Sequence, residues 1–431
     1  MYYLYNIFLI LFSPLILLVA LPIFLARKKH RGNFFLRCRP PSLPLLARDN
    51  PGPSIWIHAV SVGEVLSSLP LVKAVRSICP EAIICFSTIT LTGFEVAGEH
   101  IKPDVDFLFY LPFDIPFLMK KAVSRVSPDL VVIMETELWP NLIWEANMRG
   151  AKVVIVNGRI SDRSFPRYRK IVFFLRSLLK RVDLFLMQSK KDRDRIVSMG
   201  AQLSKVEVMR NLKYDLSSVS RTTDPMLEEK IYEIAGGRAV VIGGSTHEGE
   251  EEMLIEVTRP YMDKVLLILA PRHPERFDSV ETKVLERGHS CLRRSALENR
   301  KGPKGEFIQV ILLDTMGELQ GLYAISDVVV MGGSLVNVGG HNILEPAIYK
   351  KAVIIGPYYS NFKDIVEEFI MGDGLIIAHD LKEFQVLLRE LVEKEELRKG
   401  LGDRAYKIVS DYTGIGNLLA ERLIQMSRKD K

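Results

Sequence analysis

The sequence predicts an α/β protein of two doubly wound domains, each a parallel sheet with helices on both faces. Short apolar runs alternate with helical patterns, and glycine-rich or polar turns follow several of those runs. The chain has 431 residues, which is enough for two or three domains with sizeable cores. Hydrophobic residues make up 48% and charged residues 26%, so the composition is globular rather than disordered.

The residue types exclude several classes of function. No P-loop is present, and no G-x-G-x-x-G follows a strand and opens a helix, so a dehydrogenase is disfavoured. The sequence contains no H-E-x-x-H motif and no dense His/Asp cluster that would indicate a catalytic metal site. No nucleic-acid module is evident either. The four cysteines (Cys38, Cys79, Cys85 and Cys291) lack C-x-x-C spacing, which favours reduced structural thiols in the cytoplasm.

The N-terminus is apolar. Leu4 to Leu25 carries no charge and is long enough for a bilayer core, which takes about 20 residues. Basic residues follow at 27–31, so residues 1–30 are predicted to anchor the protein with its body on the cytoplasmic face. A cleaved signal peptide is disfavoured because no positive region precedes the run. Pro14 and Pro22 leave open a bent helix lying in one leaflet.

Residues 31–215 form the first predicted domain. A Pro-rich link leads into strand and helix patterns, with helices expected at 65–78 and 115–126. Strands are expected at 55–60, 83–86, 105–110, 130–134, 153–156 and 184–187. In parallel sheets of this kind ligands bind at the carboxyl ends of the strands.

Carboxylates follow two of these strands. Glu64 lies in a tight turn that opens a helix, where it serves either as a general base or only as a partner of the helix dipole. Glu135 and Glu137 precede Trp139, and they form either an acid/base pair or a helix start with solvated charges. Further along, basic residues interleave with apolar ones from Arg163 to Arg181. This pattern fits a helix on an anionic membrane, or a packed helix with a solvated basic face.

Residues 216–431 form the second predicted domain. Strands are expected at 239–242, 265–269, 310–313, 328–331 and 353–355, and a helical region from Leu381 to Met426 is expected to brace the first domain. Glu248, Glu250, Glu251 and Glu252 open a helix and suit its dipole. Arg272, directly after a strand, is either a phosphate clamp or an arginine tied to a nearby glutamate.

The stretch Gly332 to Ala347 reads as strand end, glycine-rich loop and helix. Such a unit offers backbone N–H groups and a helix N-terminus to an anion. Asn342 and Glu345 share one side of the first turn, so the carboxylate is placed to accept two ribose hydroxyls. The alternative is an ordinary capping box.

Taken together, the motifs resemble one family. In order along the chain they are HAVSVGE (58–64), YLPFD (110–114), METELWPN (134–141), NGRIS (157–161), NLKYD (211–215), GGSTHEGEEE (243–252), APRHPERF (270–277), MGEL (316–319) and GGHNILEPA (339–347). The sequence is similar to the bacterial 3-deoxy-D-manno-octulosonic acid (Kdo) transferases over nearly its whole length. The resemblance implies a GT-B fold with a cleft between the two domains. It also implies inverting transfer of Kdo from CMP-Kdo to the lipid A precursor lipid IVA, in lipopolysaccharide core synthesis at the inner membrane.

The resemblance also implies roles for individual residues. Glu64 corresponds to the catalytic base, and Glu135 and Lys213 correspond to groups that steady the transition state. The CMP-binding segments correspond to Pro271 and Arg272, to Met316, Gly317 and Glu318, and to Asn342, Ile343, Leu344 and Glu345. No cofactor or metal is implied. Two alternatives stay open, a GT-B transferase or epimerase using a UDP-sugar and a membrane-tethered nucleotide sensor or scaffold.

Overall fold

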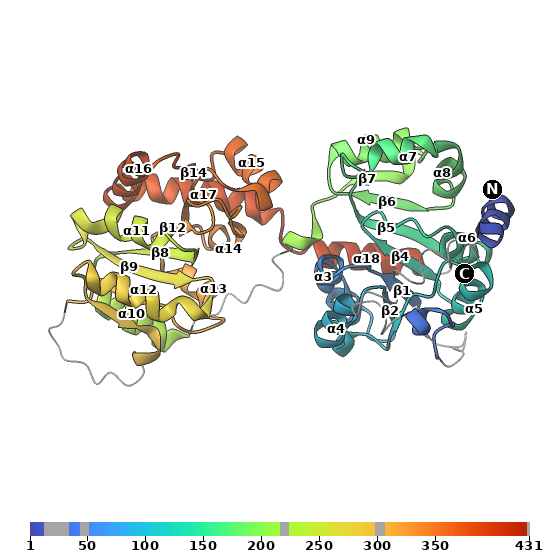
Figure 1. Ribbon diagram of the computed structural model, residues 1–431, viewed down its shortest axis with the longest axis horizontal. Helices are drawn as coiled ribbons and strands as arrows, with labels where there is room; N and C mark the ends of the chain where they lie inside the picture. The colour runs from blue at the N-terminus through green and yellow to red at the C-terminus, as the bar shows by residue number, and fades with distance from the viewer. Residues whose placement is uncertain (13–33, 44–50, 216–223, 298–306, 429–431) are drawn as a thin grey trace. The chain divides into compact units, whose positions relative to one another are not determined.

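A computed structural model describes residues 1–12, 34–43, 51–215, 224–297 and 307–428. The chain divides into two compact units. The first comprises residues 1–217 together with 414–431, and the second comprises residues 218–413. Figure 1 labels the helices and strands of both units.

The first unit is built on a parallel sheet whose described strands run in the order β3-β2-β1-β4-β5-β6-β7. The strands are β1 Ser54–His58, β2 Ile83–Thr88, β3 Phe107–Tyr110, β4 Leu130–Met134, β5 Lys152–Gly158, β6 Leu184–Met187 and β7 Val206–Val208. All six strands predicted for this domain are present. The short edge strand β7 was not predicted, because two of its three residues are exposed and no apolar run marks it.

Helices cover both faces of this sheet. They are α3 Val62–Ile78, α4 Leu91–His100, α5 Pro116–Val126, α6 Pro140–Met148, α7 Phe165–Lys170, α8 Val172–Leu179, α9 Lys190–Ser198 and α18 Ile415–Ser427. Buried side chains of α5, α6 and α8 form one core with Trp56 and the strand residues around it. The basic stretch predicted as one helix is two, α7 and α8, which are separated at Ile171.

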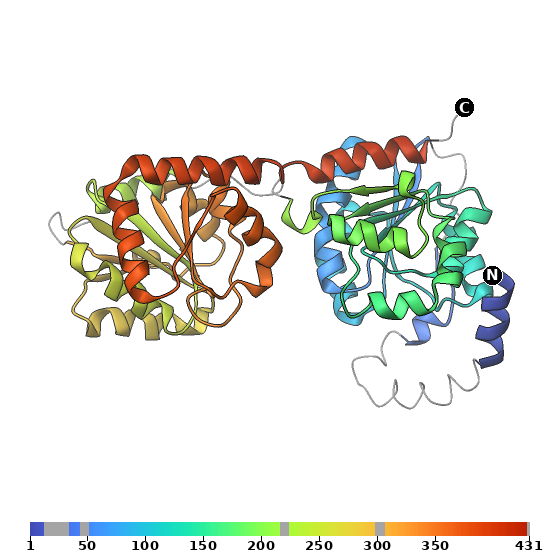
Figure 2. The ribbon, with the colours of Figure 1, turned by 90° about the horizontal axis from the view of Figure 1, so that it is seen from above.

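The last helix, α18, packs against α3 (Figure 2). The Asp215 carboxylate accepts the backbone N–H of Gly416 at 2.5 Å, and Arg422 donates to both oxygens of Glu207 at 2.6 and 2.7 Å. Gly416 must be small, because a Cβ there would lie 2.9 Å from the backbone of Pro70. A helix near the end of the chain therefore completes one face of the first unit.

The second unit repeats the pattern with the strand order β10-β11-β9-β8-β12-β13-β14, all parallel. The strands are β8 Ala239–Thr246, β9 Val265–Pro271, β10 Cys291–Arg293, β11 Val310–Leu312, β12 Val328–Met331, β13 Ala352–Ile355 and β14 Ile376–Ile377. The helices are α10 Pro225–Ala235, α11 Glu250–Thr258, α12 Phe277–Glu286, α13 Leu319–Leu322, α14 Leu344–Ala347, α15 Lys363–Met371, α16 Leu381–Glu393 and α17 Glu395–Ser410. The predicted long helical region at the end of the chain is thus three helices, α16, α17 and α18.

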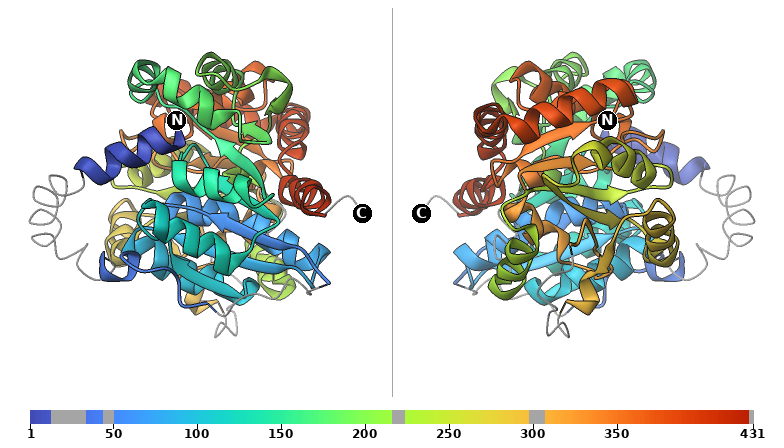
Figure 3. Two further views of the ribbon diagram at one scale, coloured as in Figure 1. Left: turned by 90° about the vertical axis from the view of Figure 1, so that its right-hand side faces the viewer. Right: turned by 90° about the vertical axis from the view of Figure 1, so that its left-hand side faces the viewer.

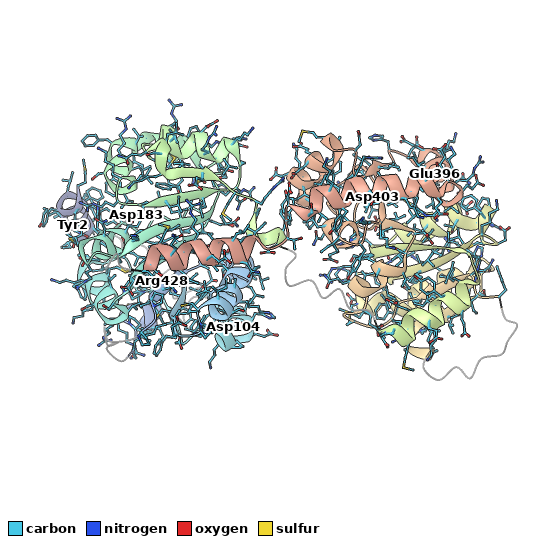
Figure 4. All side chains as sticks on the ribbon, turned by 180° about the vertical axis from the view of Figure 1, so that it is seen from behind. Tyr2, Asp104, Asp183, Glu396, Asp403 and Arg428 are labelled. Atoms are coloured by element: carbon cyan, nitrogen blue, oxygen red, sulfur yellow. The ribbon has the colours of Figure 1, made fainter. Side chains whose placement is uncertain are left out.

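Residues 2–12 form a helix on the outside of the first unit (Figures 3 and 4). Polar side chains of this helix form hydrogen bonds with the rest of the unit. Asn6 and Asn141 exchange two amide hydrogen bonds, both 2.9 Å long and buried. Tyr5 donates to Asp114 at 3.0 Å, and Tyr2 donates to Glu145 at 2.8 Å. The other side of this helix is apolar and exposed, and it comprises Tyr3, Leu4, Ile7, Phe8, Ile10 and Leu11.

The predicted membrane anchor lies only partly within these residues, because 13–33 fall outside the described part of the chain. Among the helices that the structure describes, none combines the length and the apolar character that a bilayer crossing requires. The anchor therefore stays a prediction.

Replacing Asn141 with Ala should destabilise the first unit. The change leaves the buried Asn6 amide without its partner, so we expect the free energy of unfolding to fall by about 2 kcal/mol or more. All three tryptophans of the chain lie in this unit, so urea unfolding followed by tryptophan fluorescence measures it selectively.

Asn147→Ala is the matched control, because Asn147 lies on the same helix and accepts one part-buried hydrogen bond, from Arg181. Equal losses in the two variants would contradict the importance of the amide pair.

Candidate active site

In the first unit the strand order reverses between β1 and β4, and polar groups gather where these two strands end. The chain begins at β1, adds β2 and β3 on one side, and then returns to place β4 on the other side of β1. Crossovers that leave neighbouring strands in opposite directions open a crevice at their carboxyl ends. Glu64 follows β1 and Glu135 follows β4, so both predicted catalytic carboxylates belong to this edge of the sheet.

The Glu64 side chain is fixed by the turn in which it lies. Its Oε2 accepts the backbone N–H of Val60 at 2.8 Å, and its Oε1 accepts the Ser61 hydroxyl at 2.9 Å. Ser61 caps α3 and also accepts the backbone N–H of Glu64. Glu64 thus lies in the first turn of α3, where the dipole-partner alternative places it. A carboxylate has about four acceptor positions, so these bonds leave capacity for a substrate hydroxyl.

Burial changes the acidity of this carboxylate. Glu64 is 5% exposed, and burial raises its pKa, while the hydrogen bonds from Val60 and Ser61 oppose the shift. A raised pKa makes the ionised form a stronger base.

Glu135 is the most perturbed carboxylate of the group. Its φ of 54° lies in the left-handed region, which is uncommon for a residue with a side chain. Its pKa is raised to about 7, chiefly by burial and also by the charges of Glu64 and Glu137, while the charges of Arg159 and Lys213 oppose the shift. Burial and the charge of Glu64 also raise the pKa of Glu137. The structure thus brings Glu64, Glu135 and Glu137 together with two cations.

Lys213 reaches this group through a loop tied to neighbouring strand ends. Asn157, at the end of β5, accepts the backbone N–H of Leu212 at 3.1 Å with its side-chain oxygen. Gln188 donates to the carbonyl of Asn157 at 2.9 Å and accepts from Asn211 at 3.1 Å. Sequence reasoning did not find these positioning roles for Asn157 and Gln188. The sequence feature that could have revealed these roles is the position of both residues at strand ends.

His58 lies in the same unit and is fully buried. Its Nδ1 lies 2.9 Å from the Ser87 hydroxyl, and burial lowers its pKa to about 3, so the ring is neutral. Within the described residues its Nε2 has no hydrogen-bond partner, and neither has the indole N–H of Trp139, whose ring centroid is 6.0 Å away. The sequence marked both residues only as members of motifs.

In the second unit two nearby arginines have different roles. Arg276 forms a bidentate pair with the fully buried Glu251, at 2.7 and 2.9 Å. Arg272 is exposed directly after β9, and no described residue forms a hydrogen bond or ion pair with its guanidinium. The pairing with a glutamate that the sequence left open for Arg272 is made by Arg276 instead. The guanidinium of Arg272 is available to a ligand.

The glycine-rich loop after β12 corrects one expectation. The backbone N–H groups of Gly333 and Leu335 donate to the Glu250 carboxylate at 2.7 and 2.9 Å, and that of Val336 does so at 3.4 Å. Those of Gly339 and Gly340 donate to the carbonyl of Gly333. These donors were expected to cradle an anionic ligand, but a carboxylate of the protein already occupies them. Glu250 is fully buried and more than a dipole partner.

The predicted CMP-binding segments lie at strand ends of the second unit. Asn342 donates to Glu345 at 3.2 Å and accepts from the backbone of Leu344 at 3.2 Å, which is not the reciprocal pattern of a capping box. Ile343 and Leu344 are buried, so only their backbone is available to a ligand. The helix that follows, α14, has 4 residues and is shorter than predicted.

The segment Met316–Glu318 precedes α13. Met316 is 68% exposed, and Gly317 has a φ of +87°, which glycine adopts without strain. Glu318 is held by Arg294 at 2.7 Å and by Thr315. Its carboxylate is therefore fixed by the protein, while Met316 and the turn at Gly317 are accessible.

Comparison with known proteins identifies the family. A family model described as 3-deoxy-D-manno-octulosonic-acid transferase (kdotransferase) matches residues 33–216. A 3-deoxy-D-manno-octulosonic acid transferase of Haemophilus influenzae is 35% identical, over 95% of each chain. The chain belongs to the Kdo transferase family.

Other relatives agree with this assignment. The Bordetella pertussis 3-deoxy-D-manno-octulosonic acid transferase is 30% identical over 84% of each chain. A bifunctional glycosyltransferase/methyltransferase of Fusobacterium nucleatum is 40% identical over 79% of this chain, which spans about half (53%) of that longer protein.

Solved structures share the two-domain fold. A UDP-GlcNAc 2-epimerase from Neisseria meningitidis matches with a TM-score of 0.56 and 12% identity, over 86% of this chain and 99% of that one. Anabaena Alr3699/HepE matches with 0.54 and 17%, over the same shares. The C-terminal CMP-Kdo binding domain of WaaA from Acinetobacter baumannii is 34% identical over 43% of this chain and 98% of that domain, with a TM-score of 0.39. This Kdo transferase thus has two Rossmann-like domains, as predicted. The cleft between them stays a prediction.

Glu250→Gln should loosen the glycine-rich loop. The amide keeps the size of the side chain but replaces one acceptor oxygen with a donor that faces backbone N–H groups. We expect a loss of about 3 kcal/mol in stability of the second unit, and faster hydrogen exchange in peptides covering 333–341 measured by mass spectrometry.

The neighbouring, exposed Glu248→Gln is the control and should change stability by less than about 0.5 kcal/mol. Unchanged exchange in Glu250→Gln would show that the carboxylate does not hold the loop.

Proposed function

We propose that this Kdo transferase moves Kdo from CMP-Kdo to a hydroxyl of the lipid A precursor lipid IVA, with inversion, in lipopolysaccharide core synthesis. One observation carries the proposal. Glu64 is a fixed, buried carboxylate at the strand-order reversal of the first sheet, where its neighbours are two further carboxylates and two cations. Such a group suits proton removal from a sugar alcohol.

The role of base follows from the chemistry of the acceptor. A hydroxyl attacking a glycosyl carbon must lose its proton as the new bond forms, and a positioned carboxylate is able to take it. Glu64 does not swing freely, because Val60 and Ser61 hold both oxygens. In-line attack assisted by one carboxylate inverts the configuration at the sugar carbon.

Glu135 and Lys213 supply opposite charges close to that base. Positive charge builds up on the sugar carbon as the leaving group departs, and an ionised Glu135 stabilises it. Lys213 offers a cation to the anionic groups of the donor. This role requires Glu135 to be ionised, although its pKa is about 7.

The second unit is the proposed donor site. CMP leaves as a phosphate monoester, which needs positive charge and hydrogen-bond donors rather than a proton. No described residue bonds to the guanidinium of Arg272, so its bidentate fork is available for this phosphate. The carboxylate of Glu345 has only Asn342 as a described hydrogen-bond donor, so it keeps capacity for ribose hydroxyls. Met316, Gly317 and Glu318 complete the proposed donor site beside the nucleobase of CMP.

Attachment to the cytoplasmic face of the inner membrane is part of the proposal. The acceptor's acyl chains stay in the bilayer, so its hydroxyl must be reached at the surface. The helix at residues 2–12 exposes a row of apolar side chains, and on α8 Phe173 is 76% exposed close to the basic residues of α7. Both features suit an anionic membrane surface.

The direct test is incubation with CMP-Kdo and tetraacylated lipid A precursor, with mass analysis of the product. Glu64→Gln keeps the size of the side chain but not its basicity, so turnover should fall about 10²- to 10⁴-fold. Glu99→Gln, an exposed glutamate of α4, is the control with unchanged turnover. Near-normal turnover in Glu64→Gln would exclude the base role, and absence of a Kdo-bearing product with the wild type would exclude the reaction.

Activity should fall as pH drops through 7. A carboxyl with a raised pKa is still protonated at pH values where an ordinary one is ionised, so Glu135 loses its charge below a pH of about 7. In Glu135→Gln this acidic limb of the kcat/KM profile should vanish, leaving low activity that is flat between about pH 6 and 8.

Glu137→Gln is the matched control. It should keep the limb and move it to lower pH, because the charge of Glu137 raises the pKa of Glu135. A limb near pH 7 that survives in Glu135→Gln would assign it to another group.

A further inference from the structure

Three histidines meet at the carboxyl edge of the second sheet. His247 follows β8, His273 follows β9 and His341 lies in the loop after β12, and these three strands are neighbours in the order β9-β8-β12. The strand order of this sheet reverses between β8 and β12, so the His247 and His341 loops flank the place where a ligand crevice is expected. The sequence predicts no role for these rings.

His247 and His341 are joined through their ring nitrogens. Their Nε2 atoms lie 2.8 Å apart, and the rings are parallel, with an interplanar angle of 6° and centroids 5.1 Å apart. His273 stands across the His247 ring, at a centroid distance of 5.5 Å and an angle of 78°. Among the described residues no group of three or more His, Cys, Asp or Glu side chains is arranged to hold a metal.

The joined nitrogens determine what the pair presents to a ligand. A hydrogen bond between two ring nitrogens requires that one carries hydrogen and the other does not. In neutral imidazoles, the ring that donates from Nε2 has a bare Nδ1, and the ring that accepts at Nε2 carries hydrogen on Nδ1. The pair therefore offers one Nδ1–H donor, and within the described part of the chain no hydrogen bond uses either Nδ1 atom.

Both rings are neutral around neutral pH. Burial lowers the pKa of His341 to about 4, and burial also lowers that of His247. The charge of Arg272 contributes to both shifts, and the backbone N–H of Arg272 donates to the carbonyl of Thr246 at 2.9 Å, directly before His247. The cluster thus combines one permanent cation with a neutral N–H donor, a combination that suits an anionic oxygen.

A purely structural role explains this pair less well. The two loops are already connected by Glu250, which accepts the backbone N–H of His247 at 2.8 Å as well as those of Gly333 and Leu335. They also touch directly, because a Cβ on Gly332 would lie 2.3 Å from the carbonyl oxygen of Ser245. The histidine pair is therefore not needed to hold the loops together, and both rings are partly exposed.

We infer that His247 and His341 form, with Arg272, a binding subsite for an anionic oxygen of the donor. That oxygen belongs either to the phosphate of the nucleotide or to the carboxylate of the sugar acid. The inference rests on the proposed function, since it assigns the subsite to the same donor. The inference adds two side chains to the proposed donor site. They take the place of the backbone N–H groups of the glycine-rich loop, which donate to Glu250.

The test measures dissociation constants by calorimetry on the full-length protein, with CMP, cytidine and CMP-Kdo in the absence of acceptor. A hydrogen bond to a charged group is worth roughly 10- to 100-fold in affinity. We expect His247→Ala and His341→Ala to weaken CMP-Kdo binding by about that factor and to leave cytidine binding unchanged. Arg272→Ala should behave in the same way. His379→Ala, at an exposed position of the same unit, is the matched control.

The ligands distinguish the two anionic groups. Equal losses for CMP and CMP-Kdo assign the subsite to the phosphate, and a loss for CMP-Kdo alone assigns it to the sugar carboxylate. Unchanged affinity for both, or an equal loss with cytidine, would overturn the inference. If an alanine variant does not fold, as judged by circular dichroism, the Gln variants at the same positions replace it. A wild type that binds no CMP would instead contradict the proposed donor.

Discussion

The reversal of strand order in each sheet is the constraint on which the rest of the structure depends. At β1/β4 and again at β8/β12, adjacent parallel strands send their crossovers to opposite faces, which leaves a crevice at their carboxyl ends. The residues that follow those strands therefore lie close together, although they are far apart in sequence. Glu64 and Glu135 meet in this way in the first unit, and His247 and His341 do so in the second.

Buried carboxylates show how the same residue type takes different roles at these edges. A charge removed from water must be compensated by hydrogen bonds or by an opposite charge. Glu251 is compensated by the guanidinium of Arg276, and Glu250 by several backbone N–H groups. The charge of Glu135 is compensated less well by hydrogen bonds and by opposite charges. Burial therefore leaves its pKa raised to about 7. A strongly perturbed pKa marks a candidate for a functional site, and Glu135 is such a candidate.

The sequence predicted the sheets well because strands buried on both faces leave continuous apolar runs. It also predicted which carboxylates follow which strands, since that depends only on order along the chain. It did not predict that Glu250 would bind the glycine-rich loop, because the two are separated by more than eighty residues and the capping pattern of Glu250 fits an ordinary helix start equally well. The His247–His341 contact was missed for the same reason, since nothing local marks a pair of rings brought together by two loops.

The binding of these backbone N–H groups by Glu250 changes how the proposed donor site must work. A loop that gave its backbone N–H groups to a phosphate would be ordered only when the phosphate was bound, and binding would have to supply the free energy of ordering it. With Glu250 in that position, the loop is ordered before any ligand arrives. In the proposed site, recognition then passes to side chains that project from a rigid support, Arg272 and the histidine pair. Backbone donors accept any anion of suitable size, whereas a guanidinium fork and one oriented N–H select by geometry, so this arrangement favours discrimination between donors over strength of binding.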